Sequence, residues 1–421
     1  MMTEYLPYLV AVNLTDRCNL RCAHCYMDAG QRRSGDDNEL SRADLGALLA
    51  DIARRAPSAI VVLTGGEPLM HSDIDHIIAS GAEAGLRMVL GTNGLLLDES
   101  RIKKMKSAGL QGVGISIDSV HADMHDAFRG VSGAFEKSCR AVRLCRSNGL
   151  HVQIHFTVTR SNHKQVAQIA TFGIELGASI INYFFLVCVG RGKSEIDLPP
   201  DLYEESLREI ARLQRDTPGV MVQARCAPHF KRVLYEDDPN SLFTRAGGYD
   251  GGGCIAATHY CRISPTGEMT PCPYIETSAG NVRDRSFWDI WDNAPLFQSF
   301  RSPILEGRCS VCEYRGLCGG CRARSLAQDG RLMGEDPNCS YVPRGGAAIP
   351  VLNDEAAGDC GVRWTRDAQV HLERIPVFLR KMIKRRLEEA AAKEGSPLVT
   401  TDMMKRMRRK REEELGVKFT S

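Results

Sequence analysis

The sequence predicts an α/β protein: a partial (β/α)6 barrel of the TIM type, followed by a small cysteine-rich domain and a short helical C-terminal domain. Three observations predict this organisation. Six short, β-branched runs alternate with helical patterns between residues 8 and 190, polar or glycine-rich motifs follow the strands, and most cysteines fall into two groups. Parallel strands that are buried on both faces give such runs, and the helices between them cover the sheet.

The elements of the barrel can be assigned in order from their periodicity. Strands are predicted at residues 8–15, 59–66, 87–94, 112–118, 151–160 and 179–187. Helices are predicted at residues 41–55, 73–85, 100–109, 134–149 and 164–177. In these helices apolar residues recur at i, i+3 and i+4, and glycine commonly follows the last turn.

The unusual polar motifs lie at the carboxyl ends of the predicted strands. In chain order they are the triplet Cys18, Cys22 and Cys25, then Gly65-Gly66-Glu67-Pro68, then Thr92-Asn93-Gly94, then Ser116 and Asp118. In barrels of this type, catalytic residues collect at the carboxyl ends of the strands. The sequence therefore places these motifs on one face of the barrel.

Bulk composition argues against several classes of protein. The chain has 421 residues, more than one core usually supports, and a net charge of +2 from 54 basic and 52 acidic residues. This balance gives no reason to expect nucleic-acid binding, and no run of about 18 apolar residues predicts a transmembrane segment. The amino terminus carries acids where a signal peptide would be basic. We therefore expect a cytoplasmic protein.

The chain has 16 cysteines. Disulfides are rare in large proteins that are not exported, and we expect no export signal here, so metal binding or redox chemistry is favoured over a disulfide framework. The first group is the triplet Cys18, Cys22 and Cys25. The second group lies more than two hundred residues further on and comprises Cys254, Cys261, Cys272, Cys309, Cys312, Cys318, Cys321 and Cys339.

The triplet offers three thiols where a tetrahedral metal site needs four ligands. Three thiolates can hold three irons of a four-iron, four-sulfur (4Fe-4S) cluster and leave the fourth iron for a ligand that is not protein. The alternative is a structural zinc site completed by His24 or a distant residue. Zinc loops usually pair two cysteines with two more at matching spacing, so the cluster is favoured.

The triplet after the first strand, Tyr26 beside it and the GGEP motif after the second strand together resemble radical S-adenosylmethionine (radical SAM) enzymes over residues 8 to 190. The resemblance implies that S-adenosylmethionine binds the open iron and yields a 5′-deoxyadenosyl radical. It implies that the triplet is the catalytic cluster site. The cofactor-binding residues that it implies are Tyr26, Gly65, Gly66, Glu67, Asn93, Ser116 and Arg129.

The implied roles differ along this set. Gly65, Gly66 and Glu67 would lie beside the methionine amino group, which glycine lets the backbone approach. Asn93, Ser116 and Arg129 would lie near the ribose and the carboxylate. The alternative for each of these is a turn or strand-end role that satisfies backbone groups.

The second cysteine group resembles the SPASM extension that follows many radical SAM barrels. The spacing Cys254-x12-Gly267-x4-Cys272 fits, whereas the interval between Cys318 and Cys321 is one residue shorter than usual. The resemblance implies two auxiliary 4Fe-4S clusters. We call their ligands the inner set, which is Cys254, Cys261, Cys272 and Cys321, and the outer set, which is Cys309, Cys312, Cys318 and Cys339.

Cys261 is the least certain member of the inner set. Without it the inner cluster would have an open iron that could bind substrate, whereas full ligation would favour electron transfer. A pair of zinc ribbons is the alternative to the two clusters, because C-x2-C repeats are also zinc spacing.

Five segments are expected along the chain: a barrel at 1–195, a helical connection at 196–253, the SPASM domain at 254–345, a linker at 346–361 and a basic helical domain at 362–421. The last segment has 16 basic and nine acidic residues, and it resembles the domain that ends the B subunit of dark-operative protochlorophyllide reductase. Within the connection, Cys226 and His229 are either packing residues or reach the substrate from the barrel rim.

Two enzymatic functions fit these motifs. Residues 183–192 and 258–274 resemble radical SAM enzymes that modify tetrapyrroles in heme and heme d1 synthesis. Such an enzyme would oxidise, decarboxylate or remove a tetrapyrrole side chain, and would need a low-potential donor such as ferredoxin or flavodoxin. Substrate carboxylates could pair with basic residues of the C-terminal domain, unless these form only a solvated face: Arg380, Lys381, Lys384, Arg385 and Arg386.

The second function is a peptide or protein maturase, which often carries a peptide-binding domain before the barrel. Only 17 residues precede Cys18, so we do not expect such a domain there. A simple electron carrier is disfavoured, because a carrier needs neither the GGEP motif nor an open iron.

Overall fold

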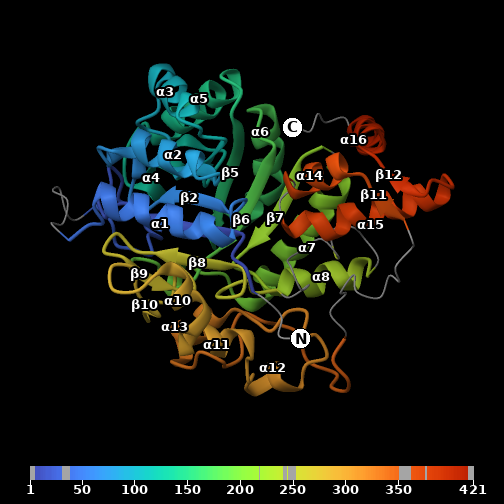
Figure 1. Ribbon diagram of the computed structural model, residues 1–421. Helices are drawn as coiled ribbons and strands as arrows, with labels where there is room; N and C mark the ends of the chain where they lie inside the picture. The colour runs from blue at the N-terminus through green and yellow to red at the C-terminus, as the bar shows by residue number, and fades with distance from the viewer. Residues whose placement is uncertain are drawn as a thin grey trace.

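The computed structural model describes residues 5–30, 38–217, 219–239, 244, 253–349, 362–374 and 377–415 (Figure 1). Its main body is a ten-stranded sheet with the order β10-β9-β8-β1-β2-β3-β4-β5-β6-β7. Seven consecutive strands pair in parallel: β1 (Leu9–Asn13), β2 (Ile60–Thr64), β3 (Arg87–Thr92), β4 (Gly112–Ser116), β5 (His151–Val158), β6 (Ile180–Phe185) and β7 (Met221–Arg225).

Helices connect consecutive strands and cover one face of the sheet (Figure 1). They are α1 (Arg42–Arg55), α2 (Ile74–Glu83), α3 (Glu99–Ser107), α4 (Ala122–Arg129), α5 (Ala134–Ser147), α6 (Val166–Glu175), α7 (Pro200–Asp216) and α8 (His229–Asp237). The predicted α/β barrel fold is confirmed, and each predicted strand and helix is present.

The sequence of α1 illustrates why these segments are helical. Ser41 and Asp44 form a capping box at its first turn, which satisfies backbone N–H groups that have no partner within the helix. Leu45, Leu49 and Ile52 are buried at the helical spacing. The apolar side of the helix therefore packs on the sheet.

The two faces of the sheet differ in burial. Residues that point outward, such as Ile115 and Ile154, are fully buried beneath the helices. Residues at alternate positions that point inward, such as Gln153 and His155, are only half-buried. A closed TIM barrel fills its interior with packed side chains, whereas the inner face here remains accessible.

The structure differs from the sequence prediction at the 196–253 connection. This segment contains the additional parallel strand β7, which pairs with β6 in register from Met221 to Arg225. The strand is short and has an exposed residue at each end, so its apolar content is low. The barrel sheet therefore extends one strand beyond the six that were predicted.

The cysteine-rich region continues the same sheet. Strand β8 (Tyr260–Ile263) pairs in parallel with β1, while β9 (Glu268–Thr270) and β10 (Gly280–Asn281) follow in antiparallel pairing. Its helices are α10 (Phe287–Asn293), α11 (Pro295–Arg301), α12 (Gly307–Val311) and α13 (Arg322–Asp329).

This region has more apolar core than its sequence suggested. The expectation was a domain shaped mainly by its ligands, yet Phe287, Trp291 and Phe297 are fully buried and belong to the same core as the barrel. The Trp291 indole N–H donates to the Tyr5 carbonyl at 2.9 Å. Two short helices therefore dock on the barrel, a contact that no local periodicity reveals.

The C-terminal segment has a small core of its own. It comprises β11 (Arg363–Trp364), α14 (Arg366–Arg374), α15 (Val377–Lys393), β12 (Leu398–Val399) and α16 (Thr401–Leu415). Leu387, Ala391, Val399 and Met403 form the core. The side chains of Arg380, Lys381 and Arg385 lie outside the described residues, as do residues 350–361 of the predicted linker, so the pairing of these side chains with carboxylates stays a prediction.

Among the described residues, no helix is both long enough and apolar enough to cross a membrane.

Candidate active site

The cysteine triplet lies in the loop after β1, and its thiols are close to one another. Burial raises the pKa of Cys18 to about 12, and the charges of Glu67, Cys22 and Cys25 add to the increase. The backbone N–H of Leu20 donates to Cys18 Sγ at 3.4 Å and opposes it. Hydrogen bonds of this kind to cluster sulfurs tune the reduction potential of iron–sulfur sites.

The loop after β2, which carries the GGEP motif, packs against the segment that leads into Cys18. The N–H of Gly66 donates to the Thr15 carbonyl at 2.8 Å, and the N–H of Glu67 donates to the Arg17 carbonyl at 2.8 Å. A Cβ atom on Gly66 would lie 2.2 Å from the Arg17 oxygen. Packing against the cysteine loop therefore requires glycine here, independently of any bound cofactor.

Glu67 is fully buried and joins the loops after β2 and β3. Its Oε1 accepts hydrogen bonds from the Leu69 N–H at 3.1 Å and the Thr92 hydroxyl at 2.7 Å. Its Oε2 accepts one from the Asn93 N–H at 2.9 Å. Burial raises the pKa of Glu67, and these bonds oppose the increase.

Asn93 and Ser116 differ in how their side chains are used. Asn93 Nδ2 donates to Asn19 Oδ1 at 2.7 Å, and its Oδ1 accepts from the Leu95 N–H at 2.9 Å. The Ser116 hydroxyl has no hydrogen-bond partner among the described residues, and the side chain is half-buried at the end of β4. Ser116 is therefore free to bind a ligand, whereas Asn93 mainly orders the cysteine loop.

Arg129 forms a buried ion pair with Asp118 and also reaches the triplet. Its Nη1 donates to Cys22 Sγ at 3.5 Å. Burial acts to raise the pKa of Asp118, but the charge of Arg129 holds that pKa below its usual value. A cation is thus fixed beside one thiol of the triplet, where it stabilises a thiolate.

His24 does not form a tetrahedral site with the triplet. Its ring stacks on Phe128 with the centroids 4.5 Å apart. Within the part of the chain that the structure describes, no three His, Cys, Asp or Glu side chains converge as a single metal ion requires. A cubane cluster spreads its thiolates over separate irons, and three thiols in one loop fit such a site.

His125 predicts a pH dependence of stability. It is 1% exposed, and its Nδ1 accepts the Asp118 N–H at 3.1 Å. Burial lowers its pKa from 6.5 to about 4, and the charge of Arg129 contributes. Below pH 6.5 the unfolded chain therefore binds a proton at His125 that the folded protein excludes, and this residue alone lowers stability by up to about 1.4 kcal/mol per pH unit down to about pH 4.

Urea unfolding at pH 7.5, 6 and 5 measures this decline. His125→Gln keeps an acceptor for the Asp118 N–H but does not titrate, so its stability should fall less steeply over the same range. An equal decline in both proteins would contradict the assignment.

Tyr26 lies between the triplet and the cysteine-rich region. Its hydroxyl donates to the Asn13 amide oxygen at 3.2 Å, which also accepts from Arg262 Nε at 3.0 Å. Its ring meets that of Tyr274 edge-on, with the centroids 5.5 Å apart. Burial raises the pKa of Tyr26, and the charges of Cys25 and Cys272 contribute to the increase. Tyr26 therefore contacts both β1, which leads into the triplet loop, and Tyr274 of the cysteine-rich region.

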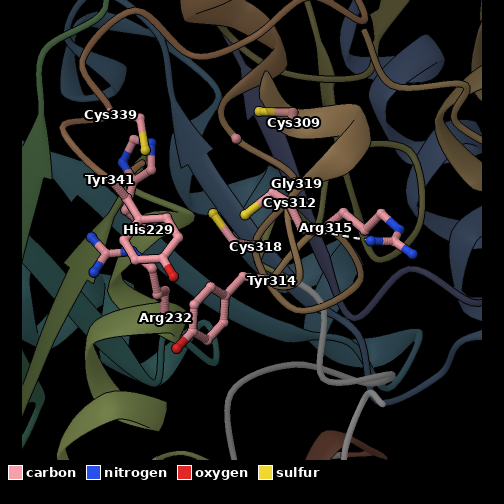
Figure 2. A pocket seen from close by; sticks show the side chains of 11 residues that line it. His229, Arg232, Cys309, Cys312, Tyr314, Arg315, Cys318, Gly319, Cys339 and Tyr341 are labelled. Carbon is pink, nitrogen blue, oxygen red and sulfur yellow. Dashed lines mark hydrogen bonds between the residues drawn. The ribbon is translucent and has the colours of Figure 1, made fainter. Parts of the chain in front are cut away.

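The four thiols of the outer set line one pocket (Figure 2). Figure 2 shows the sulfurs of Cys312 and Cys318 directed into the same space, with Tyr314 and Tyr341 nearby. Backbone N–H groups of Tyr314, Gly320 and Tyr341 each bond the sulfur of the cysteine two residues earlier. This donor set fits a 4Fe-4S cluster with four thiolate ligands.

Three residues of the inner set come together, and one further thiol joins them. Burial raises the pKa of Cys272 well above its usual value, and the charges of Cys226, Cys321 and Cys254 add to the increase. The N–H of Arg322, the residue after Cys321, bonds the sulfur of Cys254. Cys226, which the sequence predicts to be either a packing residue or a residue at the barrel rim, lies with this set.

Cys261 is not placed with the other residues of the inner set. Strand β8 sets it opposite Val10, and it is fully buried in the apolar core. Burial raises the pKa of Cys261, and the charge that opposes the increase belongs to Arg301. Because side chains alternate along a strand, its neighbours Tyr260 and Arg262 point to the other face.

A row of polar side chains crosses the inner face of the sheet. Strands β4 to β7 bring the following residues into register: Ser116, His155, Asn182 and Gln223. Arg225, the last residue of β7, is exposed and its Nε donates to Asn182 Oδ1 at 3.0 Å. Sequence reasoning missed Arg225 because it missed β7, although the alternation in residues 221–225 was a usable signal.

Comparisons with known proteins agree with this geometry. The Radical SAM superfamily model matches residues 12–173, the SPASM iron-sulfur cluster-binding domain model matches 254–321, and the model of the proto-chlorophyllide reductase 57 kD subunit matches 364–408. The AdoMet-dependent heme synthase of Methanosarcina barkeri is 36% identical over 343 residues, which cover 80% of this chain and 97% of that protein. This chain belongs to the radical SAM superfamily.

Two further relatives are less similar to this chain. The Fe-coproporphyrin III synthase of Methanosarcina barkeri is 30% identical over 79% of this chain and 87% of that protein. The PqqA peptide cyclase of Granulibacter bethesdensis is 27% identical over 82% of this chain and 90% of that protein. The crystal structure of Streptococcus suis SuiB bound to S-adenosylmethionine has the same fold, with a TM-score of 0.64 at 19% identity over 80% of this chain and 78% of that one.

The family membership confirms three of the predictions. The protein is a radical SAM enzyme, it uses a 4Fe-4S cluster that binds S-adenosylmethionine, and its SPASM domain carries auxiliary iron–sulfur clusters. The individual ligands and cofactor contacts stay predictions.

Proposed function

We propose that this radical SAM enzyme modifies a side chain of a tetrapyrrole, by oxidation, decarboxylation or removal, to form heme or a related ring. The observation that carries the proposal is the 36% identity to an AdoMet-dependent heme synthase over 80% of this chain. The PqqA peptide cyclase is less similar, at 27%. A tetrapyrrole substrate is therefore favoured over a peptide.

The residues of the chain fit defined roles in this chemistry. When bound, the catalytic cluster and S-adenosylmethionine supply a 5′-deoxyadenosyl radical that abstracts a hydrogen atom. Cys18, Cys22 and Cys25 would hold that cluster, and Arg129 would stabilise the thiolate of Cys22. Ser116 would use its free hydroxyl to bind the cofactor.

The inner face of the sheet would bind the substrate, and the auxiliary clusters would take part in electron transfer. The inner face offers Arg225 and the half-buried His155 to an anionic ligand, and a guanidinium pairs well with a carboxylate. The auxiliary clusters would accept or donate the electron that completes the reaction. A low-potential donor such as ferredoxin or flavodoxin would reduce the catalytic cluster, and we expect the enzyme to work in the cytoplasm.

Anaerobic reconstitution and titration test the proposal. The reconstituted protein should contain about 12 iron atoms, as three 4Fe-4S clusters require, and should form 5′-deoxyadenosine from S-adenosylmethionine with a strong reductant. Addition of an iron porphyrin that carries carboxylate side chains should shift its Soret band and increase 5′-deoxyadenosine formation. An unchanged Soret band together with peptide-dependent 5′-deoxyadenosine formation would instead support a peptide maturase.

Arg225→Gln is expected to weaken porphyrin binding. Loss of one charge-assisted hydrogen bond costs about 1.5–3 kcal/mol, which raises the Kd by roughly 10- to 150-fold. Arg225→Lys keeps the positive charge and should lose less affinity for the porphyrin. Arg215→Gln is the matched control, because Arg215 lies on the surface and pairs with Asp237 at 2.8 Å. Equal Kd values in the Arg225 and Arg215 variants would exclude Arg225 from the binding site.

A further inference from the structure

We propose that Cys226 is the fourth ligand of the inner auxiliary cluster, in place of Cys261. The cluster would then be held by Cys226, Cys254, Cys272 and Cys321. The SPASM match begins at Cys254, so Cys226 lies outside it, in the loop between β7 and α8. The inference rests on the auxiliary clusters and not on the identity of the substrate.

The backbone around Cys226 is fixed against the loops that carry the other ligands. Arg324, on the helix that starts directly after Cys321, donates from Nη2 to the Cys226 carbonyl at 3.0 Å. Gly253, beside Cys254, packs so closely on Pro228 that a Cβ atom would lie 2.9 Å from the proline Cβ. The segments that contain Cys226, Cys254 and Cys321 therefore contact one another directly.

Cys226 itself has a left-handed backbone, with φ of 56°. Residues other than glycine adopt this conformation rarely, and such strain concentrates at functional sites. A packing cysteine on a helix or strand would not need it. Here the conformation turns the loop after β7 toward the cysteine-rich region.

Tyr274 connects the sulfur of Cys226 to that of Cys272. The Cys226 thiol donates to the Tyr274 hydroxyl at 3.8 Å, and the Tyr274 backbone N–H donates to Cys272 Sγ at 3.5 Å. On cluster binding the Cys226 thiol would lose its proton, and the Tyr274 hydroxyl could then donate to the thiolate. Both sulfurs would keep a hydrogen-bond donor in the ligated state.

The thiols also act on one another electrostatically. Burial raises the pKa of Cys321 to about 12, and the charges of Cys254 and Cys226 contribute. Burial likewise raises the pKa of Cys226, and the charge of Cys254 contributes. The charges of Cys226, Cys254 and Cys321 also raise the pKa of Cys272. Every pair among the four thiols is therefore close enough to interact.

The fully ligated cluster suits electron transfer. Four thiolates leave no open iron to bind substrate. Asp336 also joins the inner and outer sets, because its Oδ2 accepts the Cys321 N–H at 2.8 Å while its own N–H bonds the sulfur of Cys309. Asp336 therefore links the ligand sets that would hold the two auxiliary clusters through two hydrogen bonds.

The test uses a background in which Cys18, Cys22 and Cys25 are alanine, so that the auxiliary clusters alone remain. Cys226→Ala, Cys226→Ser and Cys261→Ala are each introduced into the full-length chain, reconstituted anaerobically and reduced with dithionite. Iron content and electron paramagnetic resonance (EPR) spectra are recorded with and without cyanide, which binds an open iron. Far-UV circular dichroism checks that each variant is folded.

The background should hold about eight iron atoms and give spectra that do not respond to cyanide. Cys226→Ala should either lose about four of these iron atoms or give a spectrum that shifts with cyanide. Cys226→Ser offers an oxygen ligand of similar shape and should shift the midpoint potential of the inner cluster. This variant tests the proposal if Cys226→Ala does not fold. Cys261→Ala should match the background.

The proposal fails if the folded Cys226 variants match the background in iron content, spectrum, potential and cyanide response. It also fails if Cys261→Ala loses iron or acquires a cyanide-sensitive spectrum. Because no tetrapyrrole is added, neither result depends on the proposed substrate.

Discussion

Cys22→Ala is expected to abolish formation of 5′-deoxyadenosine and to remove about four of the 12 or so iron atoms that three clusters require. Cys22 is almost fully buried, and its sulfur accepts a hydrogen bond from Arg129 Nη1 at 3.5 Å. Two thiolates cannot retain a cluster in a loop that also leaves one iron to S-adenosylmethionine. Iron analysis and chromatography of the reaction products under anaerobic conditions measure both effects.

Cys145→Ala is the matched control for this substitution. Cys145 is also buried, on the inner side of α5, and burial raises its pKa to about 12. Its loss should cost about 1 kcal/mol of stability, as removal of a small buried group does, and should leave the iron content and the activity unchanged. If Cys22→Ala retained full iron content, the triplet would not be the catalytic cluster site.

Gly66→Ala is expected to destabilise the protein by about 1–3 kcal/mol, the usual cost of overpacking. Its new Cβ atom would lie 2.2 Å from the Arg17 carbonyl oxygen, which is backbone and cannot rotate away. Cys18 follows Arg17, so the displacement is transmitted to the cluster loop. Because a shift of about 1 Å can cost on the order of 100-fold in rate, cleavage of S-adenosylmethionine should fall by a similar factor.

Gly46→Ala is the control, because it is expected to stabilise the protein instead of destabilising it. Gly46 lies within α1, and no atom is within 4 Å of the position that its Cβ would take. Alanine in a helix interior is about 0.5–1 kcal/mol more stable than glycine. Urea unfolding and 5′-deoxyadenosine assays of the two variants together separate a local clash from a general effect of added methyl groups.

Much of the barrel could be predicted because its information is local. The period of apolar residues marks each strand and helix, and Cys18, Glu67 and Asn93 lie in the loops that follow β1, β2 and β3. Parallel strands in chain order bring their carboxyl ends to one edge, so these residues were expected to meet. The hydrogen bonds from Asn93 to Glu67 and Asn19 confirm that they do.

The roles of individual residues were harder to predict. The glycines of the GGEP motif were assigned to cofactor approach, yet the structure shows that Gly66 is also required by the Arg17 carbonyl. The resemblance assigns Glu67 and Asn93 to cofactor contacts, yet their side chains bond groups of neighbouring loops. A motif gives residue types and spacing, whereas these bonds depend on how two loops approach each other.

The sequence by itself determined the barrel, the two groups of cysteines and the chemistry that three thiols in one loop can support. The tertiary structure alone decided which thiols meet. Cys261 belongs to the cysteine-rich motif but alternates outward along β8, while Cys226 lies outside the motif and is turned toward Cys254 and Cys272 by the loop after β7. Spacing records distance along the chain, but a cluster requires ligands that are close in space, and strand direction and loop conformation set that proximity.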